Sequence, residues 1–558
     1  MSHEVPSSFG DAGDAEAQKY WQLVAQLPPT AIIDELVYTY VSEVHWIYGI
    51  IEPQYFQADL KEFRRFTSTQ PGSASIDTIH TSIKCFPAVL FQILATSLQY
   101  LPRGSGIEKS LDTTPEKLSL RYSNAGVEII QLLGNHNHCI AAVVHDLVRA
   151  AWLKNCGRGA QAWHALSDSV RKAQDLNLHQ KSRLSENPSS EEFWNEQWKK
   201  RVWAMVLIWD SNMSILLGRP RLINSVDCNA EPPLDCDIPQ DMESLHPSAA
   251  QSFTSDSNRP FSSFSPNLFM YSLSQKINDI RDSGADKRNL RDYAVVQRLH
   301  FEILSLLNTL PPVLQPGNAD HSWDMQMPVI PRQREKIYYS VQSLILALHR
   351  PHVARYLESR QRAREAAFNV LDSQQRFLEI INKHHYAYFG NAFFSIDASI
   401  VLSTILSVYP CEDTSVLQRS MLAIQLAMGQ LGLIEKQNEL ASPGLNIIRS
   451  CYQMIKDKYE ERKFGPWPER SGQGHNTNNS TSSSGDLSTA LSSQYVPEFE
   501  ADTNWESVSS SFADSDQASQ LGRNEFDTPF WIDYRQQVFT DSTFLLDGTM
   551  DGDMFGSF

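Results

Sequence analysis

The sequence predicts an all-α protein: one large domain of packed antiparallel helices, followed by a disordered acidic tail. Three observations lead to this prediction. Apolar residues recur at helical spacing almost throughout residues 20–460, and strand-like alternation is rare. Apolar residue types make up 41% of the 558 residues, enough for a sizeable core. After about residue 465 the composition changes to Ser, Asn, Gln and acidic residues, which cannot bury enough apolar surface to fold alone.

The first predicted helix lies in residues 30–51, where Thr30 follows two prolines and takes the place of an N-cap. Its apolar side chains form one stripe at helical spacing. This stripe consists of Ile33, Leu36, Val37, Tyr40, Val44, Ile47 and Tyr48. The polar, acidic residues 1–25 resemble neither a secretory signal nor a transit peptide, and we expect them to be a disordered segment of a soluble intracellular protein.

Three helices are predicted to follow. The uncharged stretch 85–102 contains Pro87, Gln92 and Gln99, so we expect a buried helix there rather than a membrane span. Residues 139–153 form a helix closed by the sequence NCGRG. Residues 160–176 form another, with Trp163 on its apolar face and Asn177 in the position of a left-handed cap.

A longer helix is predicted from the sequence NPSSEE to about Leu217. Ser189 and Glu192 have the spacing of a capping box at its start. Gly218 is expected to be its C-cap, and Pro220 prevents the helix from continuing.

An acidic residue, Asp210, lies among apolar neighbours in the middle of this helix. A buried carboxylate without a partner costs several kcal/mol. We therefore expect Asp210 to form a structural ion pair with Arg171 or Arg219 that ties two helices together, and we favour this role over a catalytic one. Replacing Asp210 with asparagine is then expected to lower stability.

The rest of the domain is predicted to be helical after one long connection. Residues 229–266 are rich in Pro, Ser and Asp, with a flexible insertion at about 235–266. Helical spacing resumes in seven ranges, which are 267–283, 289–310, 330–358, 360–383, 388–408, 413–434 and 437–461. The domain is expected to extend over residues 26–465 and the disordered tail over 466–558.

Chemically active motifs are sparse. His136, His138 and Cys139, followed by His145 and Asp146, are residue types that bind metal ions. We therefore keep a metal-dependent hydrolase as one alternative function. The sequence contains no Gly-rich phosphate loop, no G-x-S-x-G and no H-E-x-x-H. We expect no catalytic residue, no cofactor-binding residue and no metal site.

The seven cysteines are scattered without a Cys-x-x-Cys pair, which favours free thiols over a disulfide framework or a zinc site. The formal net charge of −17 argues against nucleic-acid binding, which needs clustered Lys and Arg. Most of this charge lies in residues 471–558, which hold 14 acidic residues against two arginines, leaving −5 for residues 1–470. Two short basic clusters, at 199–201 and 360–364, are predicted to lie on solvated helix faces.

Three segments in order carry a family resemblance: 27–63, 159–180 and 196–223, with LHRPHV at 348–353 as a fourth. They resemble the fungal-specific transcription factor domain, the middle homology region of zinc-cluster transcription factors. Six residues form its structural signature here: Trp163, Arg171, Asp210, Gly218, Arg219 and Pro220. Asn177 stands where the family usually has glycine.

The resemblance implies an all-helical regulatory domain in a nuclear transcription regulator, one that controls a metabolic or secondary-metabolite gene set. The zinc cluster that the family normally carries upstream needs six cysteines in two Cys-x-x-Cys groups. Met1 lies only about 26 residues before the domain begins, and we expect no zinc cofactor in this chain. Direct DNA binding is therefore doubtful. The second alternative is a non-DNA-binding cofactor or inhibitor that pairs with a complete transcription factor. The expected assemblies are a homodimer or a heterodimer with another transcription factor.

The tail combines 14 acidic residues with twelve aromatic ones in residues 471–558. Such a mixture is typical of a disordered activation segment whose aromatic side chains bind a coactivator groove as a short helix. A merely solubilising tail is the alternative. The segments expected to bind are 526–534 and 539–546, and their apolar side chains are Phe526, Phe530, Trp531, Tyr534, Phe539, Phe544, Leu545 and Leu546.

Overall fold

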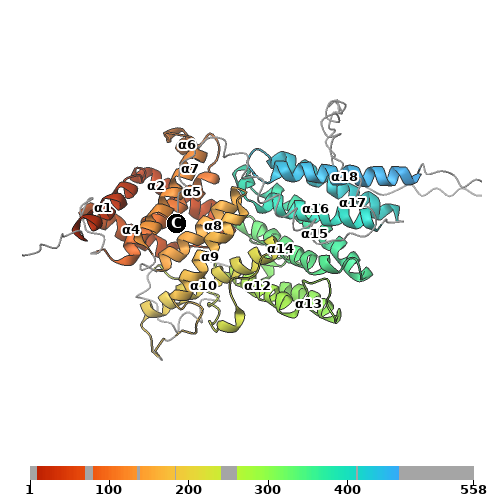
Figure 1. Cartoon of the computed structure of the whole chain (residues 1–558), viewed down its shortest axis with the longest axis horizontal. Coiled ribbons are helices and arrows are strands. Elements are labelled where there is room, and N and C mark those ends of the chain that lie inside the picture. Colours follow the sequence, from red (N-terminus) through yellow and green to blue (C-terminus); the bar gives the residue numbers. More distant parts are fainter. Residues whose placement is uncertain are drawn as a thin grey trace, which may run out of the picture. The chain divides into compact units, whose positions relative to one another are not determined.

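The chain is helical over most of the residues that the computed structural model describes, which are 9–69, 79–134, 139–182, 184–185, 187–240, 260–409 and 413–463. No strand occurs in these ranges, so the predicted all-α class is confirmed (Figure 1). The described helices, as far as Lys456 in the last of them, belong to one compact unit. The expected activation tail, 466–558, lies outside the described residues.

The helices up to residue 217 fall into a first series. They are α1 (Phe9–Val24), α2 (Thr30–Thr39), α3 (His45–Tyr48), α4 (Pro53–Thr69), α5 (Thr81–Gln99), α6 (Gly106–Ser110), α7 (Pro115–Leu133), α8 (Ile140–Asn155), α9 (Gly159–Asp175) and α10 (Ser190–Leu217). Helix α5 lies at the centre of this series, because it packs against α2, α4, α7 and α8, and α8 in turn packs against α9 (Figure 1).

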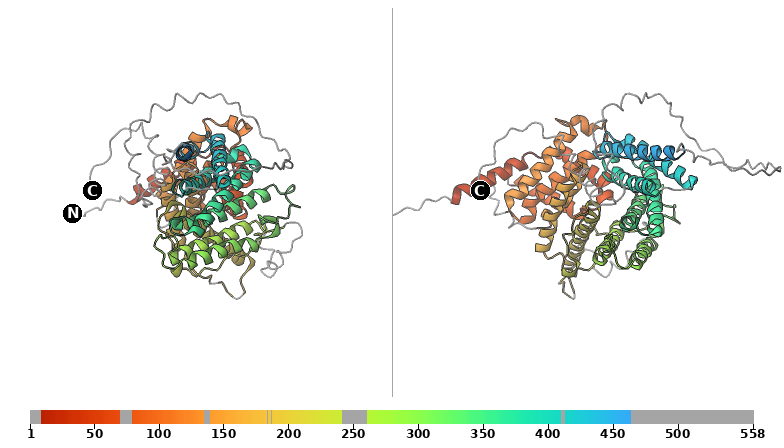
Figure 2. Two further views of the ribbon diagram at one scale, coloured as in Figure 1. Left: turned by 90° about the vertical axis from the view of Figure 1, so that its right-hand side faces the viewer. Right: turned by 45° about the vertical axis from the view of Figure 1, so that its right-hand side comes forward.

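A second series follows the connection after α10. It consists of α12 (Ser265–Ser283), α13 (Ala294–Ser305), α14 (Val329–His349), α15 (Leu357–Ile380), α16 (Gly390–Val408), α17 (Thr414–Ile434) and α18 (Ala441–Lys463). Single short turns lie between these helices: Ser225–Asp227, Leu306–Thr309, Pro312–Leu314, Arg350–His352 and Lys383–Ala387, the last of which is η8. Helices α14, α15 and α16 lie side by side (Figure 2).

Two described helices, α5 and α16, are long and apolar enough to cross a membrane by length and composition alone. The surrounding helices bury 89% and 72% of their apolar windows. They therefore serve as core helices of the domain, in agreement with the buried helix expected near residues 85–102.

The predicted helix ends agree closely with the structure because their signals are local. Asn177 has φ of 56° and Gly218 has φ of 65°, so both take the left-handed conformation in which a helix ends. Ser189 and Glu192 form the capping box: Ser189 Oγ accepts from the Glu192 N–H at 3.2 Å, and Glu192 Oε2 accepts from the Ser189 N–H at 2.8 Å.

Several boundary predictions are wrong. Residues 9–24 form α1 rather than a disordered segment, and Tyr20 is buried and donates to the Lys84 carbonyl at 3.0 Å. Thr30 is the first residue of α2 and not its N-cap, because Pro29 takes that place without a side-chain bond. A single π-helical turn, η1 (Tyr40–Val44), interrupts the helix expected at 30–51.

The connection after α10 is partly packed. Of the expected flexible insertion at 235–266, residues 235–240 and 260–266 are described. Cys236 and Ile238 are buried in a cluster with Trp194, and α12 already begins at Ser265. The prediction of a flexible segment is therefore wrong at both of its described ends.

Candidate functional site

Asp210 anchors the chain that turns back after α10. It is 1% exposed, and its carboxylate accepts from two consecutive backbone N–H groups. The Leu222 N–H lies 2.9 Å from Oδ1 and 3.2 Å from Oδ2, and the Ile223 N–H lies 2.9 Å from Oδ2. Burial raises the pKa of Asp210, and these two backbone bonds act against that rise.

The expected ion pair of Asp210 is therefore wrong. Arg171 is exposed and lies 3.5 Å from Asp168 on its own helix. The Arg219 guanidinium lies over the Trp163 ring, 4.9 Å from its centre, as a cation–π contact. The sequence could not distinguish a carboxylate bonded to backbone N–H groups of a loop from one in an ion pair, because either partner satisfies a buried acid.

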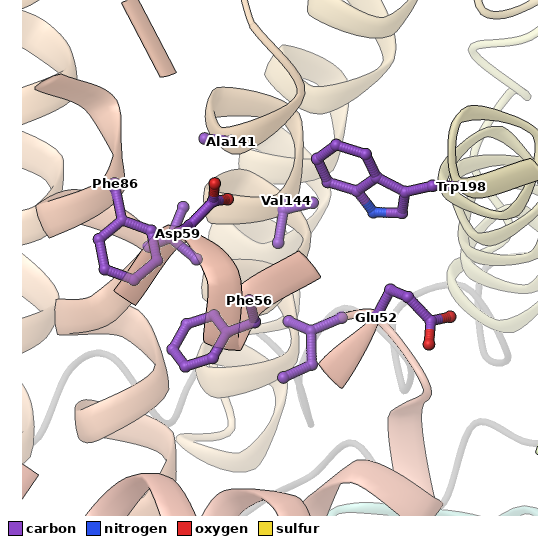
Figure 3. A pocket seen from close by; sticks show the side chains of 9 residues that line it. Glu52, Phe56, Asp59, Phe86, Ala141, Val144 and Trp198 are labelled. Atoms are coloured by element: carbon purple, nitrogen blue, oxygen red, sulfur yellow. The ribbon is translucent and has the colours of Figure 1, made fainter. Parts of the chain in front are cut away.

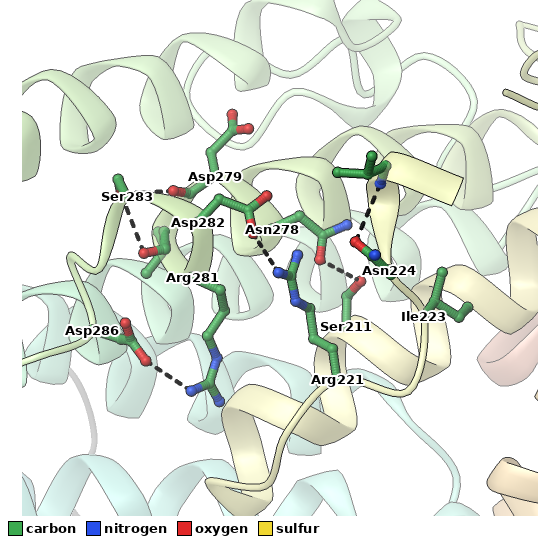
Figure 4. A network of polar contacts seen from close by, with 12 residues as sticks. Ser211, Arg221, Ile223, Asn224, Asn278, Asp279, Arg281, Asp282, Ser283 and Asp286 are labelled. Carbon is green, nitrogen blue, oxygen red and sulfur yellow. Dashed lines mark hydrogen bonds and ion pairs between the residues drawn. The ribbon is translucent and has the colours of Figure 1, made fainter. Parts of the chain in front are cut away.

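A polar network continues from this anchor to α12 (Figure 4). Arg221 pairs with Asp282, and Arg281 bonds Asp286 at 2.7 Å and the Ser214 carbonyl at 2.7 Å. The Gly-Arg-Pro end of α10 is thereby held to α12. Of the signature residues, Asp210 and Arg219 thus hold the chain that turns back after α10, and the contacts of Arg221 and Arg281 join it to α12.

The basic cluster at 199–201 contains a buried ion pair. Arg201 is 3% exposed, and its guanidinium donates to Glu52 at 2.6 Å and also to the Cys236 carbonyl. It lies over the Phe264 ring as well, 4.7 Å from the centre. The prediction of a solvated face is wrong for Arg201. Burial raises the pKa of Glu52, and the Arg201 charge opposes that rise.

A small pocket adjoins this ion pair (Figure 3). Phe56, Phe86, Val144 and Trp198 line it together with Asp59, whose pKa burial raises to about 6. A displaced carboxyl pKa in a pocket is a common sign of a catalytic acid. The cavity measures only about 20 Å³, room for about one water molecule, so it does not admit a substrate.

His145 and Asp146 line a cavity of about 280 Å³, but their side-chain atoms are already bonded to other residues. The ring of His145 is 1% exposed, with Nδ1 at 2.8 Å from Asp146 Oδ1 and Nε2 at 3.1 Å from Gln92 Nε2. The Gln92 amide donates to Nε2, so the ring proton lies on Nδ1 and is donated to Asp146. Lys172 bonds the other oxygen of Asp146 at 2.5 Å. Both ring nitrogens are therefore occupied, and His136 and His138 lie outside the described residues.

A second cluster of possible ligands, Glu43 with His384 and His385, places three ligand atoms within 4.8 Å of one another. The backbone N–H of Asn382 donates to His385 Nδ1 at 3.2 Å, so the proton of that ring lies on Nε2. His385 Nε2 donates to the Glu43 carbonyl at 3.0 Å, and His384 Nε2 lies 2.9 Å from Glu43 Oε2. The hydrogen bonds of the two histidines lower the pKa of Glu43. The cluster therefore fits a tether between η1 and η8 better than a metal site.

A cavity of about 530 Å³ lies between the ends of α5, α7 and α8, the turn η8 and the end of α17. We call it the α5–α17 cavity. Its lining residues are Leu98, Gln99, Leu101, Pro102, Arg103, Pro115, Glu116, Ser119, Leu120, Trp152, Asn155, Cys156, Arg158, Lys383, His384, Ala387, Lys436, Gln437 and Glu439. Its size falls in the range of small-molecule sites. The sequence contains no local sign of it, because its walls come from residues 98–158 and 383–439, which are far apart in the chain.

The LHRPHV turn at 348–353 joins several helices. His349 Nε2 lies 2.9 Å from His300 Nδ1, and His349 Nδ1 lies 2.9 Å from Ser359 Oγ. Arg350 bonds Asp397 on α16 at 3.1 Å, and His352 Nε2 donates to the Ala285 carbonyl at 2.7 Å. These three side chains of the motif therefore serve packing between helices.

Acid is expected to destabilise the domain through His349. Burial, together with the positive charges of His300, His352 and Arg362, lowers the pKa of His349 from 6.5 to about 3. Between these pH values the unfolded chain holds a proton that the folded chain does not. The contribution of His349 to the free energy of unfolding is fully present above pH 6.5. It falls as the pH drops below that value, by up to about 1.4 kcal/mol per pH unit. Between pH 6.5 and 5, the free energy of unfolding measured with urea should depend less steeply on pH in His349→Asn than in the unchanged protein. The difference in slope should correspond to about one proton. An unchanged slope would contradict this.

The described part of the chain is thus an all-helical scaffold in which Asp210 and the Arg219–Trp163 contact hold the end of α10 in place. The α5–α17 cavity of this scaffold is large enough for a small molecule. The chain belongs to the fungal specific transcription factor domain family, whose model matches residues 37–327. The names of this family and of the relatives below are those of transcription factors.

Two curated relatives are similar to the chain. The "Pyrrolocin cluster transcription factor fsdR" of Fungal sp. (strain NRRL 50135) is 23% identical over 380 residues, 63% of this chain and 45% of the relative. The "Transcription factor phm2" of Pyrenochaetopsis sp is 22% identical over 376 residues, 63% of this chain and 46% of the relative. The chain thus spans about half the length of each. The solved K. lactis CBF3 core is 11% identical with a TM-score of 0.46, over 82% of this chain and 97% of that one.

Proposed function

We propose that this protein is a fungal transcription regulator that acts in the nucleus and controls a metabolic or secondary-metabolite gene set. The family match over residues 37–327 carries the proposal. The name of one relative, a transcription factor of the pyrrolocin cluster, supports the kind of gene set. Regulators of transcription work on chromatin, which supports the nucleus as the compartment.

We further propose that the tail activates transcription. Its supporting observation is composition: 14 acidic and twelve aromatic residues in residues 471–558. The acidic residues keep the aromatic side chains hydrated until a coactivator groove accepts them as a short amphipathic helix. The apolar groups for such binding are concentrated in 526–534 and 539–546.

Fusing residues 471–558 to a foreign DNA-binding module is expected to raise transcription of a reporter by at least about tenfold. The physical reason is the recruitment of a coactivator by the aromatic side chains. Reporter transcript is the measurement. In the fungus itself, deleting residues 471–558 should lower a defined set of transcripts, and RNA sequencing would identify that set.

A matched control separates activation from a merely solubilising tail. The fusion with Phe530→Ala and Trp531→Ala keeps every charge and should lose most of the signal, whereas a fusion of residues 471–525 should be nearly silent. A reporter that responds equally to all three fusions would contradict the proposed segments. Silence of the intact tail would favour the alternative below.

The alternative is a non-DNA-binding cofactor or inhibitor that acts as a heterodimer with a complete transcription factor. Its supporting observation is that these 558 residues contain no Cys-x-x-Cys pair and so do not themselves supply the family's zinc cluster. DNA contact then comes from a partner or from residues outside this sequence. We expect this chain alone to give no sequence-specific gel shift.

A further inference from the structure

The α5–α17 cavity has an apolar lining on a scale that suits an organic molecule. Its volume of about 530 Å³ compares with 300–1,000 Å³ for small-molecule sites in general. The apolar side chains come from four elements or their flanks: Leu98, Leu101, Pro102, Leu120, Trp152 and Ala387. An apolar body placed here would gain from burial against them.

The polar groups of the cavity floor are already satisfied by one another. Gln99 donates to the Trp152 carbonyl at 3.2 Å and accepts from Asn155 at 3.0 Å. The Trp152 Nε1–H donates to Ser119 Oγ at 2.8 Å. Burial raises the pKa of the Cys156 thiol to about 12, so this group is neutral. The polar groups of the floor therefore do not require a charged or hydrogen-bonding group on a ligand.

The rim, in contrast, carries positive charge without partners. Arg158, Lys383 and Lys436 line the cavity, and none of them forms an ion pair with any residue that the structure describes. Arg103 differs from them, because it bonds Glu116 at 2.6 Å. Glu439 adds one negative charge. The rim thus keeps a net positive charge beside an apolar floor, although the domain as a whole is acidic.

We propose that the α5–α17 cavity binds a small amphipathic organic anion, with its apolar body on the Leu120–Trp152 floor and its acidic group at Arg158, Lys383 and Lys436. A neutral apolar molecule would leave the three cations unused, and a compact polar anion would leave the apolar floor hydrated. This inference goes beyond the proposed function, since binding can be measured without any transcription readout.

His384 gives this site a physical connection to the rest of the domain. It lines the cavity, and its Nε2 lies 2.9 Å from Glu43 on η1. An acidic ligand at Lys383 would compete with Glu43 for the same imidazole. Asn155, on the floor, accepts from Tyr48 at 2.9 Å and from the Phe389 N–H at 3.2 Å. Occupation of the cavity therefore acts on contacts that join the first helix series to the second.

The test compares two fluorescent probes with the same aromatic body. The anionic probe is 1-anilinonaphthalene-8-sulfonate, and the neutral one is N-phenyl-1-naphthylamine. We expect the full chain to bind one anionic probe, and the double variant Lys383→Gln with Lys436→Gln to weaken it by about five- to tenfold. Binding of the neutral probe should not change. Both lysines are exposed, so the double variant is expected to fold.

Two further variants decide the outcome. Lys61→Gln with Lys287→Gln removes the same charge from exposed positions outside the cavity and should leave both probes unaffected. Leu120→Trp places a bulkier side chain in the cavity wall and should weaken the binding of both probes. If the two lysine pairs weaken the anionic probe equally, the effect comes from the net charge of the protein and the anion site is wrong. Absence of probe binding, or binding of both probes that is unchanged in Leu120→Trp, would overturn the cavity as a ligand site.

Discussion

Replacing Arg201 with alanine is expected to lower the free energy of unfolding by about 3–5 kcal/mol, because it removes one partner of a buried ion pair. The change leaves the Glu52 carboxylate, whose side chain is 10% exposed, without its 2.6 Å bond. It also removes the donor to the Cys236 carbonyl and the contact with the Phe264 ring. Chemical unfolding followed by circular dichroism measures the loss.

A neighbour in the same helix provides the control for this change. Lys200 pairs with Glu231, whose side chain is 48% exposed, so Lys200→Ala should cost about 1 kcal/mol or less. Combining Arg201→Met with Glu52→Leu removes both charges and should recover part of the stability. If Arg201→Ala costs no more than Lys200→Ala, the ion pair does not stabilise the fold.

Asp210→Asn is expected to lower the free energy of unfolding by about 2–3 kcal/mol. The amide offers one acceptor oxygen, and its NH₂ group would face one of the two N–H donors of Leu222 and Ile223. One of these two backbone N–H donors would thus lose its partner in the chain reversal after α10, which the Asp210 carboxylate stabilises. Chemical unfolding gives the energy, and hydrogen exchange at Leu222 and Ile223 should become faster.

Asp282 supplies a matched comparison in the same region. It pairs with Arg221, and its side chain is 51% exposed, so Asp282→Asn should cost about 1 kcal/mol or less (Figure 4). Exchange at Leu222 and Ile223 should then stay slow. Equal losses from both substitutions, or protection at these two amides that survives in Asp210→Asn, would argue against the anchor.

The helix ends could be predicted because each rests on a few adjacent residues. The left-handed conformation of Asn177 and Gly218 and the capping box at Ser189 were all expected from short patterns. Helix α1 was not predicted, because it has only a short group of apolar residues around Tyr20. These residues are buried only when α1 packs against α7 and the start of α5.

The burial of Asp210 was predicted correctly and its partner wrongly, for a physical reason. Apolar neighbours on a helix predict burial, but a buried acid is satisfied equally well by arginine or by backbone N–H groups. Which of these is close depends on the path of the chain after Gly218. Arg201 was misplaced in the same way, since a Lys-Lys-Arg run does not reveal which side chain faces the Cys236 carbonyl.

Residue spacing and caps within a few residues were enough to predict the helical class, the ends of α9 and α10 and the family of the protein. The pairing of Glu43 with His384 and the walls of the α5–α17 cavity depend instead on how the helices pack. Partners separated by 341 residues meet only when helices pack, and packing depends on the shapes of whole faces rather than on any short pattern.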